Sequence, residues 1–212
     1  MRVYDPAGRA DGSAALLYIH GGGYVLGTAA ADDGVCADLA RRLGALVVSV
    51  DYRLAPEHPF PGPHEDCLRA LRWLHAEADE LRVDRARIGV SGESAGGGLA
   101  AGLVQRAVDD GIPVRFQHLI YPMLDDRTVL RAEDSGAWHA IWTPASNRFG
   151  WTSYLGHEPG LDVAAPYAVP ARRESLAGLP PTWIGVGTAD LFHDEDVAYS
   201  QALRAAGVEC EL

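Results

Sequence analysis

Short apolar runs recur along the chain, and helical patterns fill the intervals between them. Several runs are continuous, as in Leu-Val-Val-Ser-Val at residues 46–50, rather than alternating with polar residues. Continuous runs are typical of strands covered on both faces, and strands that alternate with helices favour a parallel sheet. We therefore expect an α/β fold, with a mostly parallel sheet and helices on both faces. The expected strands are residues 2–4, 14–19, 45–50, 87–90, 116–121, 182–186 and 209–212.

Apolar residues at every third or fourth position predict the helices, because this spacing forms one stripe per helix. Such stripes run through residues 35–43, 68–74, 99–104 and 197–203. Of the 212 residues, 48% are hydrophobic, which is enough to bury one sizeable core. We therefore expect a single domain over residues 1–212.

Residues 125–177 interrupt this alternation with a concentration of aromatic side chains, and we predict an aromatic-rich helical insertion there. The insertion either forms a lid or pocket wall over a site, or packs as a helical excursion on the edge of the sheet. The sequence leaves both alternatives open. The aromatic residues in question are Trp138, Trp142, Phe149, Trp151 and Tyr154.

The formal net charge is -11, and all 18 basic residues are arginine. Because no stretch concentrates positive charge, we expect neither nucleic acid nor an anionic membrane as a partner. The absence of lysine excludes a Ser-Lys dyad, a Schiff-base enzyme and a P-loop, each of which requires an amine.

The three cysteines, Cys36, Cys67 and Cys210, are far apart and match no metal-binding spacing. We expect free thiols, no metal and no cofactor. The first residues include no apolar leader, and no apolar run approaches the length of a membrane span. These features lead us to predict a cytoplasmic location.

Two glycine-rich motifs each follow an expected strand. Gly-Glu-Ser-Ala-Gly at residues 92–96 places Ser94 where a strand turns into a helix, which would hold its hydroxyl above the sheet as a nucleophile. His-Gly-Gly-Gly-Tyr at residues 20–24 supplies backbone donors of the kind that acyl transfer needs. Taken alone, the serine motif could instead be a tight strand–helix turn that only packs closely. The oxyanion donors would be the N–H groups of Gly22, Gly23 and Ala95.

These motifs resemble those of the hormone-sensitive-lipase-like family of α/β-hydrolases, the carboxylesterases with an HGGG oxyanion motif. The resemblance includes Asp-Tyr-Arg-Leu-Ala-Pro-Glu-His-Pro-Phe-Pro at residues 51–61, Tyr-Pro at 121–122 and Gly-Thr-Ala-Asp-Leu at 187–191. It implies hydrolysis of short acyl esters with Ser94 as nucleophile. His20 and Gly21 belong to the oxyanion motif, and His20 is expected to fix that loop. Glu93 stands where aspartate is commoner in the family.

The resemblance implies that Asp190 is the acid of the catalytic triad. Asp190 also follows an expected strand, where an open parallel sheet places its site residues, and the order of serine before acid is that of the α/β-hydrolases. From the residues alone, Asp190 could equally cap the next helix. Asp194, Glu195 and Asp196 are then rival acids.

The triad histidine has no candidate at the place that the resemblance implies. His193 is the only histidine after Asp190, and its position so soon after Asp190 is a poor one from which to reach both Ser94 and Asp190 as a base. The other histidines carry no spacing that marks a base or a metal site. We therefore expect this chain to lack the triad histidine and to hydrolyse esters slowly.

Compared with the family, the chain begins without the N-terminal cap and ends near the start of the last strand, so we expect a truncated domain. The unfinished edge near residues 209–212 could join two copies into a homo-oligomer. The alternative to an esterase is a non-catalytic α/β-hydrolase-like module that binds a small ligand.

Overall fold

The computed structural model describes residues 1–131, 142–162 and 164–212, which form a seven-stranded sheet in the order β1-β3-β2-β4-β5-β6-β7. β1 is antiparallel to β3, whereas every other neighbouring pair is parallel. The predicted α/β fold with a mostly parallel sheet is confirmed. The strands are β1 (Arg2–Tyr4), β2 (Ser13–Ile19), β3 (Leu46–Val50), β4 (Val83–Glu93), β5 (Gln117–Ile120), β6 (Thr182–Gly185) and β7 (Cys210–Glu211).

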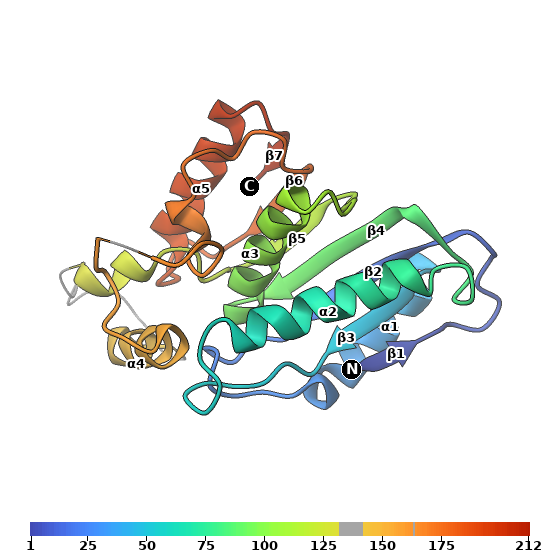
Figure 1. The fold of residues 1–212 in the computed structure, drawn as a ribbon, viewed down its shortest axis with the longest axis horizontal. Coiled ribbons are helices and arrows are strands. Elements are labelled where there is room, and N and C mark those ends of the chain that lie inside the picture. The colour runs from blue at the N-terminus through green and yellow to red at the C-terminus, as the bar shows by residue number, and fades with distance from the viewer. Residues whose placement is uncertain (132–141, 163) are drawn as a thin grey trace.

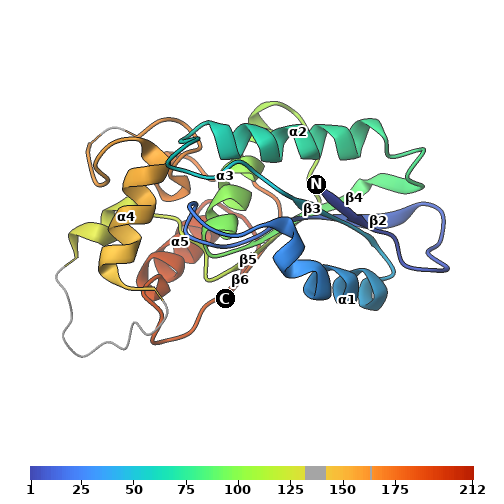
Figure 2. The same ribbon diagram turned by 90° about the horizontal axis from the view of Figure 1, so that it is seen from below.

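Helices cover both faces of the sheet, and Figure 2 shows α1 on one side and α2 on the other. The chain alternates strand and helix along most of its length (Figure 1), as the apolar runs and stripes predicted. The α-helices are α1 (Asp33–Leu43), α2 (Gly62–Ala76), α3 (Ala95–Asp109), α4 (Pro144–Leu155) and α5 (His193–Ala205), and the 3₁₀ helices are η1 (Ala29–Asp32), η2 (Asp126–Leu130) and η3 (Pro170–Arg172).

The continuous apolar run in β2 is divided between the two faces because successive side chains of a strand point in opposite directions. Leu17 and Ile19 belong to the main core, to which α2, α3 and α5 contribute. Leu16 and Tyr18 point to the opposite face and pack with Cys36 and other residues of α1. Burial on both faces explains why the run contains no alternating polar residue.

β4 extends to Glu93 and so is longer than the predicted strand of residues 87–90. The additional residues are held by pairing with β2, whose register places Ile19 opposite Gly92. This pairing is tertiary, and the polar residues at both ends of β4 gave no sign of it in the sequence. It carries the strand to the residue before Ser94.

Part of the aromatic-rich segment forms α4, which begins after Thr143, whose side chain accepts a hydrogen bond from the N–H of Ser146. Trp151 and Tyr154 are buried and pack around Tyr24, with ring centroids 5.2 and 4.0 Å away. These two aromatic residues therefore contribute to the core. Trp138, which the sequence assigned to the same insertion, lies outside the described residues.

Candidate active site

Ser94 occupies a strained backbone conformation between β4 and α3, with φ 54° and ψ -122°. Residues other than glycine rarely adopt such a positive φ. The neighbouring glycines are required by close contacts. A Cβ on Gly92 would lie 2.2 Å from the carbonyl oxygen of Gly96, and a Cβ on Gly96 would lie 2.2 Å from that of Ile19. The strand and helix therefore meet in a turn that only these small residues permit.

The backbone of Ser94 is anchored by the last residue of β5 and by a residue just beyond it. Its N–H donates to the carbonyl oxygen of Ile120 at 2.8 Å, and its carbonyl oxygen accepts from the N–H of Met123 at 3.0 Å. The N–H of Gly98 donates to the same carbonyl oxygen at 3.1 Å and begins the helical ladder of α3. Hydrogen bonds on both sides of Ser94 thus hold the strained turn in place.

His20 and Gly21 fix the loop after β2. The His20 ring is buried and stacks on Tyr52 at a centroid distance of 4.2 Å. Its Nδ1 lies 2.8 Å from the carbonyl oxygen of Gly21, and the Tyr52 hydroxyl donates to the carbonyl oxygen of His20 at 2.9 Å. A Cβ on Gly21 would lie 3.3 Å from the carbonyl oxygen of Glu93. The loop therefore lies directly against the residue before Ser94.

Gly22 and Gly23 follow with φ of 114° and 59°, in the region that favours glycine. The carbonyl oxygen of Gly22 accepts hydrogen bonds from the N–H groups of Val25 and Leu26, which closes a tight turn. A Cβ on Gly23 would lie 2.0 Å from Cη2 of Trp142. The indole ring thus lies against this backbone, a contact that the sequence did not predict.

Asp190 lies half-buried on the loop after β6, at the same edge of the sheet as Ser94. Its Oδ1 accepts a hydrogen bond from the N–H of Phe192 at 2.8 Å, so its side chain is tied to the start of α5. No side-chain hydrogen bond joins Asp190 to Ser94 within the described residues. The structure therefore places both at one edge of the sheet without a direct link.

The three rival acids have different surroundings. Asp194 is exposed and contacts the His193 ring, with 3.0 Å between Oδ1 and Nδ1. Glu195 is buried, and burial raises its pKa to about 8 against the opposing effect of three hydrogen-bond donors. Asp196 is also buried, and neither carboxyl oxygen has a hydrogen-bond partner in the part of the chain that the structure describes. Its pKa is raised to about 10 by burial and then by the charges of Glu195 and Asp190.

No histidine side chain in residues 1–131, 142–162 or 164–212 forms a hydrogen bond with Ser94 or Asp190. His118 instead has its Nδ1 3.0 Å from the hydroxyl of Ser91, on the sheet, and burial lowers the pKa of its ring. His64 is buried, and burial also lowers its pKa. His139 lies outside the described residues.

Glu93 extends toward Tyr121, whose hydroxyl donates to its Oε2 at 3.2 Å. Burial, together with the charge of Glu93, raises the pKa of Tyr121, which therefore stays protonated at neutral pH. The sequence gives no sign of this contact, although the Tyr-Pro pair at residues 121–122 belongs to the family resemblance. Only the parallel pairing of β4 and β5 makes the two residues neighbours.

The described residues contain no group of three or more metal-binding side chains that could hold an ion. Among the helices that they form, none has the length and apolar character needed to cross a membrane.

Comparisons with known proteins agree on one family. The α/β-hydrolase fold profile matches residues 16–212. Esterase LipI of Mycobacterium tuberculosis is 42% identical over 217 residues, and carboxylesterase NlhH of the same species is 40% identical over 220 residues. Both alignments cover 100% of this chain and 67% of the relative, so the chain spans about two thirds of their length.

Solved structures agree with the sequence comparison. A bacterial heroin esterase superposes with a TM-score of 0.94 at 44% identity, covering 100% of this chain and 68% of the other. A Pyrobaculum calidifontis esterase gives a TM-score of 0.87 at 39% identity, covering 98% of this chain and 68% of the other. The strained serine, the glycine loop and these similarities lead to one assignment: the chain belongs to the α/β-hydrolase fold family, among the hormone-sensitive-lipase-like esterases.

Proposed function

We propose that this chain carries the site of a serine carboxylesterase that hydrolyses short-chain acyl esters through an acyl-enzyme on Ser94. One observation carries the proposal: Ser94 is held at φ 54° between β4 and α3, and the glycine loop lies against the residue before it. Relatives named as esterases support the same reaction class.

In the proposed reaction, the Oγ of Ser94 attacks the ester carbonyl carbon while its proton passes to a base. The carbonyl oxygen becomes negative and accepts hydrogen bonds from the N–H groups of Ala95, Gly22 and Gly23. The C–O bond to the alcohol then breaks, and the alcohol leaves with a proton. In the second half of the reaction, the oxygen of a water molecule attacks the acyl carbon and gives up a proton, the bond from that carbon to Oγ breaks, Oγ regains a proton, and the carboxylic acid leaves.

We propose Asp190 as the acid that would orient a histidine base. Its half-buried position after β6 supports this role, since Glu195 is already engaged by other donors and Asp194 is exposed. Because no histidine of the described residues is bonded to Asp190, we expect a 212-residue protein of this sequence to retain only the acceleration from binding and the oxyanion donors. In serine hydrolases with an incomplete triad, this residual acceleration is about three to four orders of magnitude over the uncatalysed reaction in water.

Hydrolysis of p-nitrophenyl acetate and butyrate tests the proposal, with Ser94→Ala as the matched control. We expect slow release of p-nitrophenol and mass-spectrometric detection of an acyl group on Ser94, both absent in Ser94→Ala. Equal rates in the two proteins would refute Ser94 as the nucleophile. Fast turnover that Ser94→Ala abolishes would refute the expected impairment.

The alternative is a module that binds a small ligand without catalysis, and the observation that favours it is the absence of a histidine contact to Ser94 among the described residues. Treatment with a fluorophosphonate separates the two functions. Labelling at Ser94 supports the esterase, whereas saturable ligand binding without labelling supports the module.

We further propose that the insertion of residues 125–177 forms a wall of the substrate pocket. The contact of the Trp142 ring with Gly23 supports this role, because Gly23 belongs to the proposed oxyanion loop. Association of two copies through the edge at β7 stays a prediction.

A further inference from the structure

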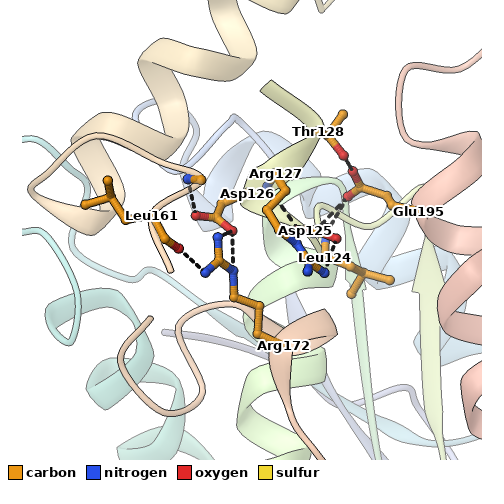
Figure 3. A network of polar contacts seen from close by, with 9 residues as sticks. Leu124, Asp125, Asp126, Arg127, Thr128, Leu161, Arg172 and Glu195 are labelled. Atoms are coloured by element: carbon orange, nitrogen blue, oxygen red, sulfur yellow. Dashed lines mark hydrogen bonds and ion pairs between the residues drawn. The ribbon is translucent and has the colours of Figure 1, made fainter. Parts of the chain in front are cut away.

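Glu195 lies in the first turn of α5 with a side chain that is nearly inaccessible to solvent. Its Oε1 accepts hydrogen bonds from the N–H groups of Leu124 at 2.7 Å and Asp125 at 3.1 Å. Its Oε2 accepts from the hydroxyl of Thr128. Figure 3 shows all three donors converging on this one carboxylate from the segment that follows β5. A single side chain therefore ties α5 to that segment.

The segment that Glu195 holds is the one that anchors the proposed nucleophile. Leu124 directly follows Met123, whose N–H donates to the carbonyl oxygen of Ser94 at 3.0 Å. Ser94 in turn donates its N–H to Ile120, at the end of β5. A shift of Leu124 would therefore act on the backbone of Ser94 through a single intervening residue.

The first turn of α5, which carries Glu195, is also bonded to Asp190. The N–H of Phe192 donates to the side chain of Asp190, and the N–H of His193 donates to its carbonyl oxygen at 3.2 Å. The carbonyl oxygen of Phe192 accepts from the N–H of Asp196 at 3.0 Å, inside the first turn of α5. Asp190 thus follows any movement of the turn that contains Glu195.

The neighbouring arginines do not supply the link. The guanidinium group of Arg127 donates two hydrogen bonds to Asp125, and Arg172 pairs with Asp126, as Figure 3 shows. The carboxyl group of Glu195 is instead bound by two backbone N–H groups and a hydroxyl. The two backbone N–H groups belong to the segment after β5 itself. Their hydrogen bonds to Glu195 therefore fix the position of that segment directly, which a bond to a flexible arginine side chain would not do.

We infer that Glu195 is a positioning residue for this site, holding the backbone of Ser94 at a fixed distance from the loop that carries Asp190. The inference rests on the proposed function, in which Ser94 attacks the ester carbonyl while the N–H groups of Ala95, Gly22 and Gly23 bind its oxygen, so the position of the Ser94 backbone sets the acylation rate. A displacement of about 1 Å between reacting groups can reduce a rate about a hundredfold, so such a link would be required for reactivity rather than for folding alone.

Three substitutions of Glu195 differ in how many of its hydrogen bonds they keep. In Glu195→Gln, the amide oxygen can still accept from Leu124 and Asp125, and the Thr128 hydroxyl can rotate to accept from the amide nitrogen. Glu195→Ala removes all three hydrogen bonds. Glu195→Asp keeps a carboxyl group but withdraws it by one methylene, so it cannot reach all of its donors.

Asp109 offers a matched control at the opposite end of α3 from Ser94. Its carboxylate also accepts three hydrogen bonds, two from Arg173 at 2.7 and 2.8 Å and one from the Tyr167 hydroxyl at 2.9 Å. None of these groups contacts Ser94, Asp190 or the segment after β5 through a hydrogen bond in the described residues. Asp109→Ala should lower stability without changing the reactivity of Ser94.

The experiment measures acylation of Ser94 by p-nitrophenyl butyrate over a range of concentrations, with urea unfolding of each protein in parallel. We expect the saturating acylation rate of Glu195→Ala to fall about ten- to a hundredfold with little change in the half-saturating concentration. Glu195→Gln should stay within about threefold of the unsubstituted protein, and Asp109→Ala should react normally. Amide hydrogen exchange at Leu124 and Asp125 should accelerate in Glu195→Ala and Glu195→Asp, but not in Glu195→Gln or Asp109→Ala.

Normal acylation in folded Glu195→Ala would overturn the inference, as would an equal loss in Asp109→Ala. If Glu195→Ala does not fold, Glu195→Asp decides: reduced acylation supports the inference, and an unchanged rate overturns it. No acylation of Ser94 in the unsubstituted protein would refute the proposed function and the inference together. Loss of acylation in a Glu195 variant, while the unsubstituted protein is acylated normally, is a different result and concerns the inference alone.

Discussion

The backbone of Ser94 provides a direct test of strain at the site. Its φ of 54° and ψ of -122° lie where a Cβ is unfavourable, and such conformations cost about 1–3 kcal/mol. Glycine has no Cβ and would relieve this strain. The proposed nucleophile is therefore held in a conformation that lowers the stability of the fold.

Comparing Ser94→Gly with Ser94→Ala isolates the effect, because both substitutions remove the hydroxyl and only alanine keeps the Cβ. The Ser94 side chain makes no capping hydrogen bond to α3, so its loss leaves no helix donor unpaired. Relief of about 1–3 kcal/mol of strain is opposed by about 0.4–1 kcal/mol from the greater freedom of glycine in the unfolded chain. We expect Ser94→Gly to be more stable than Ser94→Ala by about 1 kcal/mol.

Urea unfolding followed by circular dichroism measures this difference in the free energy of unfolding. For a protein of this size, about 1 kcal/mol also corresponds to a rise of about 2–4 °C in the melting temperature. Both variants should lack acylation at residue 94. A Ser94→Gly protein that is no more stable than Ser94→Ala would refute the argument that the turn is strained.

Two further substitutions test other parts of the site. Gly23→Ala should lower the free energy of unfolding by about 1–2 kcal/mol and slow acylation, because alanine is strained at φ 59° and its Cβ would collide with Trp142. Urea unfolding and acylation equal to those of the unsubstituted protein would contradict the contact between Gly23 and Trp142. Burial raises the pKa of Asp196 to about 10, so between about pH 4 and 10 the unfolded chain binds fewer protons than the folded chain and stability falls as pH rises. Asp196→Asn should remove this dependence, which amounts to at most about 1.4 kcal/mol in the free energy of unfolding per pH unit. Urea unfolding at pH 5 and 8 measures it, and an unchanged pH dependence in Asp196→Asn would contradict the raised pKa of Asp196.

Much of the fold was predictable because its causes are local. Continuous apolar runs mark strands buried on both faces, and β2 shows why, with Leu17 in the main core and Leu16 against α1. The strand limits were less predictable: β4 extends to Glu93 through pairing with β2, which depends on residues about 70 positions away.

The sequence by itself determined that Ser94 stands at a strand–helix turn and that the loop of residues 20–24 follows another strand. Gly22 and Gly23 have positive φ, and Gly92 lies against the nearby Gly96, so these glycines encode local conformations that depend on neighbours in the chain. Asp190 could be ranked among four nearby acids only through the resemblance to a family.

Only the tertiary structure decided how these parts meet. Parallel pairing of β2 with β4 brings Gly21 against Glu93, and the insertion brings Trp142 against Gly23. The same structure turns Glu195 inward to the segment after β5, which no spacing in the sequence indicates. Helical periodicity can place a side chain on the buried face of α5, but the hydrogen-bond donors that meet it there come from distant residues. Contacts of that kind arise only when the packed fold sets the distances between elements.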